Sequence, residues 1–182
     1  NRYNTNTNDG SQLNGSLTLD INFTEFLKFN ATSTGIWGHT NYAHYDNALY
    51  GPKVGVNGEV EKYQNDSFRQ NHTQTLTYFD QFGKHNINIL AGHEYYYTKS
   101  TYLGATARGL FSAEVPEIDA AADKITSSSY ISEYNVEGYF GSAQYNYDDK
   151  YFASVSYRRD ASSYFVKENR WGDFWFVGAA WF

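Results

Sequence analysis

Polar and apolar residues alternate with a period of two along several stretches of this chain. Within 12–22 the odd positions are apolar or small and the even positions are polar. After a break at 23–26 the alternation resumes, with Leu27, Phe29 and Ala31 separated by polar residues. Successive side chains of a β-strand point to opposite faces, so these stretches predict strands with one apolar and one polar face.

The same pattern returns through the rest of the chain. Further strands are predicted, in order, at 67–79, from Asn86 onward, at 139–147, at 151–160 and from about 171 to 182. In the Thr-rich segment 67–79 the parity of the alternation is ambiguous. The chain therefore predicts an all-β fold of about seven strands, each long enough to cross a bilayer at a tilt with ~9–11 residues.

Short and long connections alternate between these strands. Turns are predicted near 23–26, 80–84 and 148–150, and longer stretches at roughly 38–66, 98–133 and 160–170. Tight periplasmic turns and long extracellular loops are typical of outer-membrane β-barrels. We therefore expect an antiparallel transmembrane β-barrel whose first and last predicted strands both run toward the periplasm.

The composition supports a sheet with one solvent-exposed face and one lipid-facing face. Aromatic residues make up 19% of the chain, although its mean hydropathy of -0.66 is polar. Aromatic rings favour membrane interfaces, and no run approaches the ~18 apolar residues of a spanning helix. A net charge of -6 without a Lys/Arg cluster argues against a nucleic-acid partner. The absence of cysteine excludes disulfides and thiol chemistry.

Charged residues avoid the middle of the predicted apolar face. A Lys or Arg at the bilayer midplane would cost about 2–4 kcal/mol. The exceptions on the apolar parity are His93, Glu137 and Arg159, near the predicted outer ends of their strands. We expect these residues to meet lipopolysaccharide head groups there.

Several motifs resemble one barrel family. The pieces are Tyr139-Phe140-Gly141, Asp149-Lys150-Tyr151, Arg158-Arg159-Asp160 with Ser162-Ser163, Asn169-Arg170-Trp171-Gly172, Phe82-Gly83-Lys84-His85-Asn86 and Gly92-His93-Glu94. Together they resemble barrel hairpins of the SusC/RagA-like TonB-dependent transporters of Bacteroidetes. The sequence departs from the family pattern at Ala161, where glycine is expected, and at Ser142, where arginine is common.

The resemblance implies a larger protein than this chain. Such transporters are about 22-stranded barrels with an N-terminal plug domain. Seven strands cannot close a single-chain bacterial barrel, which uses an even number from about eight upward. We therefore expect residues 1–182 to be part of the barrel domain, with the plug and the remaining strands outside this chain and Asn1 an internal or processed start.

Aromatic residues of the predicted long loops are candidates for substrate contact, because aromatic rings stack on sugars and pack against peptide side chains. In the alternative interpretation, Trp37 belongs to the interfacial girdle and the others pack loop on loop. These candidates are Trp37, Tyr42, Tyr45, Tyr50, Tyr102 and Phe111. A helix-like patch near 118–122 is interpreted as an ordered loop turn.

Charged and histidine side chains offer few other sites. Arg158 and Asp160 share the polar parity and are predicted to join a charge network in the barrel lumen, rather than to bind substrate directly. His39 and His44 lie close in sequence, but no zinc-motif spacing accompanies them. No nucleophile–base arrangement is recognisable, so we predict neither an enzyme nor a metal site nor a cofactor.

The leading hypothesis is a wall segment of an outer-membrane transporter that imports an oligosaccharide or peptide. The resemblance implies two partners, a SusD-like surface lipoprotein and TonB. No residue of this chain by itself indicates either of them. The alternative is a small autonomous outer-membrane barrel with a structural or adhesive role, which the terminal Phe182 supports. An outer-membrane enzyme ranks third.

Overall fold

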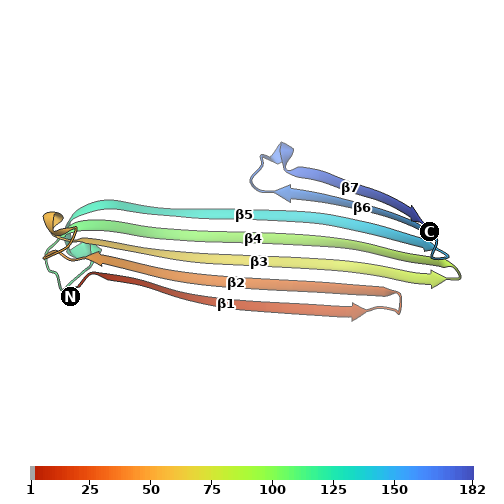
Figure 1. Ribbon diagram of the computed structural model, residues 1–182, viewed down its shortest axis with the longest axis horizontal. Helices are drawn as coiled ribbons and strands as arrows, with labels where there is room; N and C mark the ends of the chain where they lie inside the picture. Colours follow the sequence, from red (N-terminus) through yellow and green to blue (C-terminus); the bar gives the residue numbers. More distant parts are fainter. Residues whose placement is uncertain (1–2) are drawn as a thin grey trace. The chain divides into compact units, whose positions relative to one another are not determined.

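The computed structural model describes residues 3–182, which form a single β-sheet with three short 3-10 helices in its connections (Figure 1). The strands are β1 Thr5–Asn22, β2 Leu27–Asp46, β3 Glu59–Phe82, β4 His85–Leu110, β5 Ala121–Tyr147, β6 Tyr151–Ser162 and β7 Trp171–Trp181. The 3-10 helices are η1 Val54–Val56, η2 Ile118–Ala120 and η3 Lys167–Asn169. None of the helices within 3–182 has the length and apolar character needed to span a membrane.

The seven strands follow one another in the sheet in sequence order, from β1 to β7. β5 and β6 are antiparallel, and their paired residues run from Tyr147 opposite Tyr151 to Val136 opposite Ser162. β6 and β7 are also antiparallel. The predicted all-β, antiparallel architecture is confirmed. β1 and β7 lie at the two edges of the sheet, so the described residues do not close into a barrel.

Strands β2 to β5 are longer than the sequence predicted. The expected long connections at 38–66 and 98–133 are wrong, because most of their residues continue the strands and only 47–58 and 111–120 connect them. The third connection spans 163–170. The regular alternation of polar and apolar residues is lost in these extensions, because neither face there is covered by lipid along its length. The strands still form because strand pairing needs only backbone hydrogen bonds. The helix-like patch is the single turn η2, as interpreted.

Cross-strand contacts show that one face of the sheet is polar. The Ser16 and Thr34 hydroxyls are hydrogen-bonded at 3.1 Å, and the Asn30 amide donates to the Asp20 carboxylate at 2.6 Å. The even positions of β1 and β2 therefore share a face. The Lys28 ammonium lies 4.9 Å from the ring centre of Phe79, which puts the odd positions of β3 on that face as well. The ambiguous parity of 67–79 is thereby resolved: Leu76 faces away from the polar side.

The opposite face is apolar along its middle. Ala143 of β5 pairs with Val155 of β6, which pairs with Val177 of β7. Val155 is 48% exposed and Leu17 of β1 is 73% exposed, so the described chain does not cover this side. We call the two sides the apolar face and the polar face. The end of the strands with the short turns is the turn end, and the other is the loop end.

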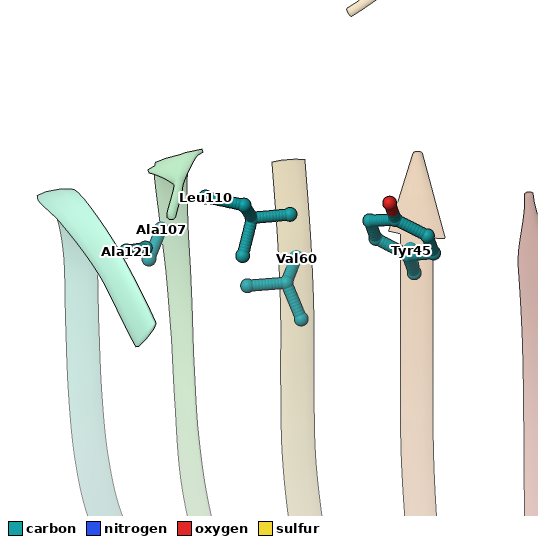
Figure 2. Close-up of a cluster of buried hydrophobic side chains, with 5 residues drawn as sticks. All are labelled: Tyr45, Val60, Ala107, Leu110 and Ala121. Atoms are coloured by element: carbon teal, nitrogen blue, oxygen red, sulfur yellow. The ribbon is translucent and has the colours of Figure 1, made fainter. Parts of the chain in front are cut away.

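The chain divides into two compact units. Of the described residues, the first unit, the core region, comprises 3–13, 36–68 and 99–133, and the second, the wall region, comprises 14–35, 69–98 and 134–182. The core region contains a cluster of buried apolar side chains (Figure 2). Ile118 of η2 packs against this cluster. Its members are Tyr45, Val60, Ala107, Leu110 and Ala121. This cluster holds the connections 47–58 and 111–120 against the strands.

Candidate functional site

The apolar face of the wall region carries a polar and aromatic belt toward the loop end. The His93 ring is hydrogen-bonded to Gln74 at 2.8 Å and to Glu137 at 3.3 Å. The Tyr139 hydroxyl donates to Glu137 at 2.6 Å. His93, one of the expected exceptions on the apolar parity, therefore has polar partners on two neighbouring strands.

The belt continues on β6 and β7. The Arg159 guanidinium lies 5.2 Å from the ring centre of Trp171 and 3.7 Å from the Asp173 carboxylate. The Tyr157 hydroxyl also donates to Asp173. A cation held over an indole ring beside a carboxylate is well suited to a membrane–water boundary.

A second aromatic belt crosses the apolar face near the turn end. His85 stacks on Phe82 at 5.1 Å and is hydrogen-bonded to the Tyr145 hydroxyl at 2.7 Å. Tyr151 pairs with Trp181. From Tyr151 to Arg159 a strand rises ~27 Å, or ~20 Å after a tilt of about 40°. That height is close to the ~25 Å apolar band of outer-membrane barrels.

The polar face of the wall region carries an ion network centred on Arg158. The Arg158 Nε donates to both Asp160 oxygens at 2.8 Å, and its Nη2 donates to the Glu94 carboxylate at 3.0 Å. The predicted pair Arg158 and Asp160 thus lies together on the polar parity. Glu94 was not among the predicted site residues, although its even position in β4 would have placed it on this face.

Two glycines, Gly92 and Gly138, leave room for the side chains of this network. The guanidinium lies 5.4 Å from the ring centre of Phe140, and that ring covers Gly92, where an added Cβ would approach the ring to 2.3 Å. At Gly138 an added Cβ would meet an Asp160 oxygen at 2.3 Å. The glycines therefore let an aromatic ring and an ion pair lie flat against the sheet.

Near the turn end of the wall region lies a hollow of about 880 Å³. Amide side chains of Asn88, Gln144 and Asn146 contribute to its lining, together with the rings of Phe152 and Phe176. Amides supply both donors and acceptors, and the rings supply apolar area. Such a surface suits a polypeptide or another ligand with mixed polarity.

In the core region, a row of tyrosines crosses four strands. Tyr42 stacks on Tyr63 at 4.6 Å between ring centres, Tyr63 lies 5.7 Å from Tyr102, and Tyr102 stacks on Tyr130 at 5.1 Å. We call these four residues the tyrosine row. Tyr63 and Tyr130 were not among the predicted contacts, although both lie in the stretches taken as loops, because nothing local showed that they pair with Tyr42 and Tyr102 across strands. Tyr42 and Tyr102, two of the predicted substrate contacts, are brought together by Tyr63.

The other predicted aromatics lie apart from the row. Tyr45 is 2% exposed in the buried cluster, and its hydroxyl donates to the Ala113 carbonyl at 3.3 Å. Trp37 stacks on His39 in β2 at 5.9 Å. Tyr50 and Phe111 lie in connections and are 45% and 77% exposed. The burial of Tyr45 favours packing, and the exposure of Phe111 leaves it free for contact.

Glu59 anchors a charge cluster at the loop end of β3. Its carboxylate lies 3.0 Å from the Lys53 ammonium and also accepts a hydrogen bond from Arg108. Burial acts to raise the pKa of Glu59, but the hydrogen bonds and charges of Lys53 and Arg108 outweigh burial and hold that pKa below its usual range. The cluster ties the start of β3 to the end of β4.

Residues 3–182 contain no group of three or more side chains able to hold a metal ion. His39 is hydrogen-bonded to Asp66 at 2.6 Å, and His44 lies 3.4 Å from Asp46. The two histidines thus have separate carboxylate partners.

Comparison with known proteins agrees with this geometry. The chain is 33% identical over 133 residues to TonB-dependent receptor P3 of Formosa agariphila, covering 70% of this chain and 13% of that protein. It matches the structure of the RagAB peptide transporter with a TM-score of 0.89 at 22% identity, covering 97% of this chain and 20% of that chain. The RagAB peptide importer in its open-open state matches with a TM-score of 0.88. No family model matches.

A sheet with one apolar face bounded by aromatic belts, in the fold of these barrels, is the wall of an outer-membrane β-barrel. The chain belongs to the TonB-dependent receptors, as the resemblance of its motifs predicted, and it has the fold of the RagAB barrel that it matches. It spans only 13% of the length of its curated relative.

Proposed function

We propose that the complete protein is an outer-membrane transporter that imports an oligosaccharide or a peptide, with residues 1–182 forming part of its barrel wall. The observation that carries the proposal is the two-faced sheet, which turns an apolar side to lipid and an ion-paired, amide-rich side to a lumen. A purely structural protein would not need the Glu94–Arg158–Asp160 network on its inner side.

The plug domain, TonB and a SusD-like surface lipoprotein are proposed as partners through parts outside this chain. Support for the lipoprotein comes from the RagAB transporter, whose fold this chain shares. The 880 Å³ hollow offers amide and aromatic surface to a polypeptide inside the lumen, as a plug would require. The wall itself would have no catalytic role.

The alternative of a small autonomous barrel is less well supported. Within residues 3–182 the edge strands β1 and β7 do not pair with each other. An open edge in lipid leaves backbone donors and acceptors unsatisfied, at several kcal/mol for each group. We therefore propose that further strands of the complete protein close the wall.

Deletion of the complete gene tests the transport proposal. We expect the deletion strain to lose growth on one polymer, glycan or protein, and to grow normally on its monomers, which cross the outer membrane without the transporter. Reintroduction of the gene should restore growth. Unimpaired growth of the deletion strain on every polymer tested would overturn the proposal.

A further inference from the structure

β5 has an open edge toward the loop end. β6 pairs with β5 only from Val136 to Tyr147, and β5 begins at Ala121 (Figure 1). Among residues 3–182, no strand pairs with 121–134 on the side away from β4. This edge arises because β6 is 12 residues long and β5 is 27.

The parity of the backbone identifies the groups on this edge. Asn135 exchanges hydrogen bonds with Ser163 on the β6 side: its carbonyl accepts from the Ser163 amide, and its amide donates to the Ser163 hydroxyl. In an antiparallel strand the N–H and C=O of one residue point to the same neighbour, and the side alternates along the chain. The edge groups are therefore those of Asp123, Ile125, Ser127, Ser129 and Ile131.

The middle of this edge lacks the usual protection against pairing. Natural edge strands carry charges, prolines or bulges that block the addition of another strand. The stretch from Ile125 to Ser132 has no charge, no proline and no glycine. Each of its residues is exposed.

A ring of the tyrosine row ends at the same edge. Tyr130 stacks on Tyr102 of β4, so its second ring face points toward the open side, and Tyr130 is 56% exposed. A strand added beside β5 would lie ~4.8 Å away. A ring on that strand would therefore extend the tyrosine row by one stacked member.

We propose that the open edge of β5 binds an extended, uncharged stretch of a peptide substrate by strand addition, with an aromatic side chain of the peptide stacked on Tyr130. This inference rests on the proposed transport function and assigns its substrate class. Main-chain hydrogen bonds would supply the affinity, which makes capture tolerant of sequence. That tolerance suits a transporter that must accept many peptides and release them.

Other occupants fit the edge less well. A glycan has no row of alternating donors and acceptors at the spacing of a β-strand. A stable protein interface needs large apolar or aromatic anchors, whereas the middle of this edge is Ser127, Ser128 and Ser129.

The binding test uses the complete transporter in lipid nanodiscs and a fluorescent, uncharged octapeptide of Thr and Val with a central Tyr. The control peptide carries N-methyl groups on alternate residues, which remove the donors that face β5. We expect the unmethylated peptide to bind and the methylated one to bind at least about tenfold more weakly. Hydrogen exchange should slow at the odd-numbered amides of 123–131 when the unmethylated peptide is added.

Two substitutions at one position complete the test. Ser129→Pro removes an edge N–H that does not bond β4, a position where an edge strand tolerates proline, and it should weaken peptide binding at least about tenfold. Ser129→Ala keeps the N–H and should bind normally. The heat-modified electrophoretic mobility of both variants should match that of the unsubstituted transporter, since the barrel is intact.

Several outcomes would overturn the inference. They are equal binding of the methylated peptide, normal peptide binding by Ser129→Pro, no binding at all, and odd-numbered amides already protected without peptide, which would mean that another segment or a partner protein covers the edge. If the transporter takes up an oligosaccharide and no peptide, the inference fails and the transport function stands. Only unimpaired growth of the gene-deletion strain on every polymer tested would overturn the transport function itself.

Discussion

The core region and the wall region are built from the same strands but are stabilised in opposite ways. The core region buries Tyr45, Val60 and Leu110 among themselves, as a soluble protein does. In the wall region the large apolar side chains are exposed, with Trp175 at 77% and Val177 at 64%. A strand can therefore change its solvent partner along its length without a break in its backbone pairing.

The largest expected effect tests the core region. Leu110→Ala removes a fully buried side chain and should destabilise the connections 47–58 and 111–120 by about 2–5 kcal/mol. Hydrogen exchange of those connections measures the loss. Leu103→Ala, at a position that is 59% exposed, is the control and should have little effect. Equal protection in the Leu110 and Leu103 variants would contradict a buried core.

The next prediction tests the wall region. Val155→Lys places a charge in the middle of the apolar face and should destabilise the barrel by about 2–4 kcal/mol. Reversible unfolding of the complete transporter in lipid vesicles measures the change. Its matched control is Ser154→Lys on the polar face, which should leave stability nearly unchanged. If the two variants reverse in order, the assignment of the faces is wrong.

A smaller effect is expected where the polar face is most closely packed. Gly92→Ala forces the Phe140 ring away from the sheet and should cost about 1–3 kcal/mol. Displacement of the ring should also loosen Arg158. Thermal melts of Gly92→Ala, Arg158→Met and the double variant should then show non-additive losses. Gly15→Ala, where nothing lies within 4 Å of an added Cβ, should be neutral.

The smallest expected effect depends on pH. Because the folded-state pKa of Glu59 is lowered, its stabilisation is present above the unfolded-state value near 4.5 and is lost as the pH falls through the folded-state pKa. Glu59→Gln should cost about 1 kcal/mol at neutral pH and remove this acid sensitivity from the core region. Hydrogen exchange at pH 7 and below pH 4 measures both. Glu117→Gln, in an exposed pair with Lys62, should behave as wild type.

The sequence predicted the strands correctly where one face of the sheet is apolar along its length. In 12–22 and 139–160 the alternation was clear, and the predicted strands and the turn at 148–150 are present. It failed in 38–66 and 98–133, where no clear alternation marks the strands and they were taken as loops. The aromatic candidates suffered most from this error, because Tyr42 and Tyr102 belong to a row whose other members, Tyr63 and Tyr130, carried no recognisable signal.

The local sequence by itself determined the period of the strands, the two faces of the wall and the positions of the short turns. These depend only on the direction of successive side chains and on which solvent each face meets. Only the tertiary structure decided that Glu94 meets Arg158 across 64 positions of sequence, that the tyrosine row exists and that β5 extends past β6. Such features depend on the register between strands and on their relative lengths, which no local pattern in a single strand encodes.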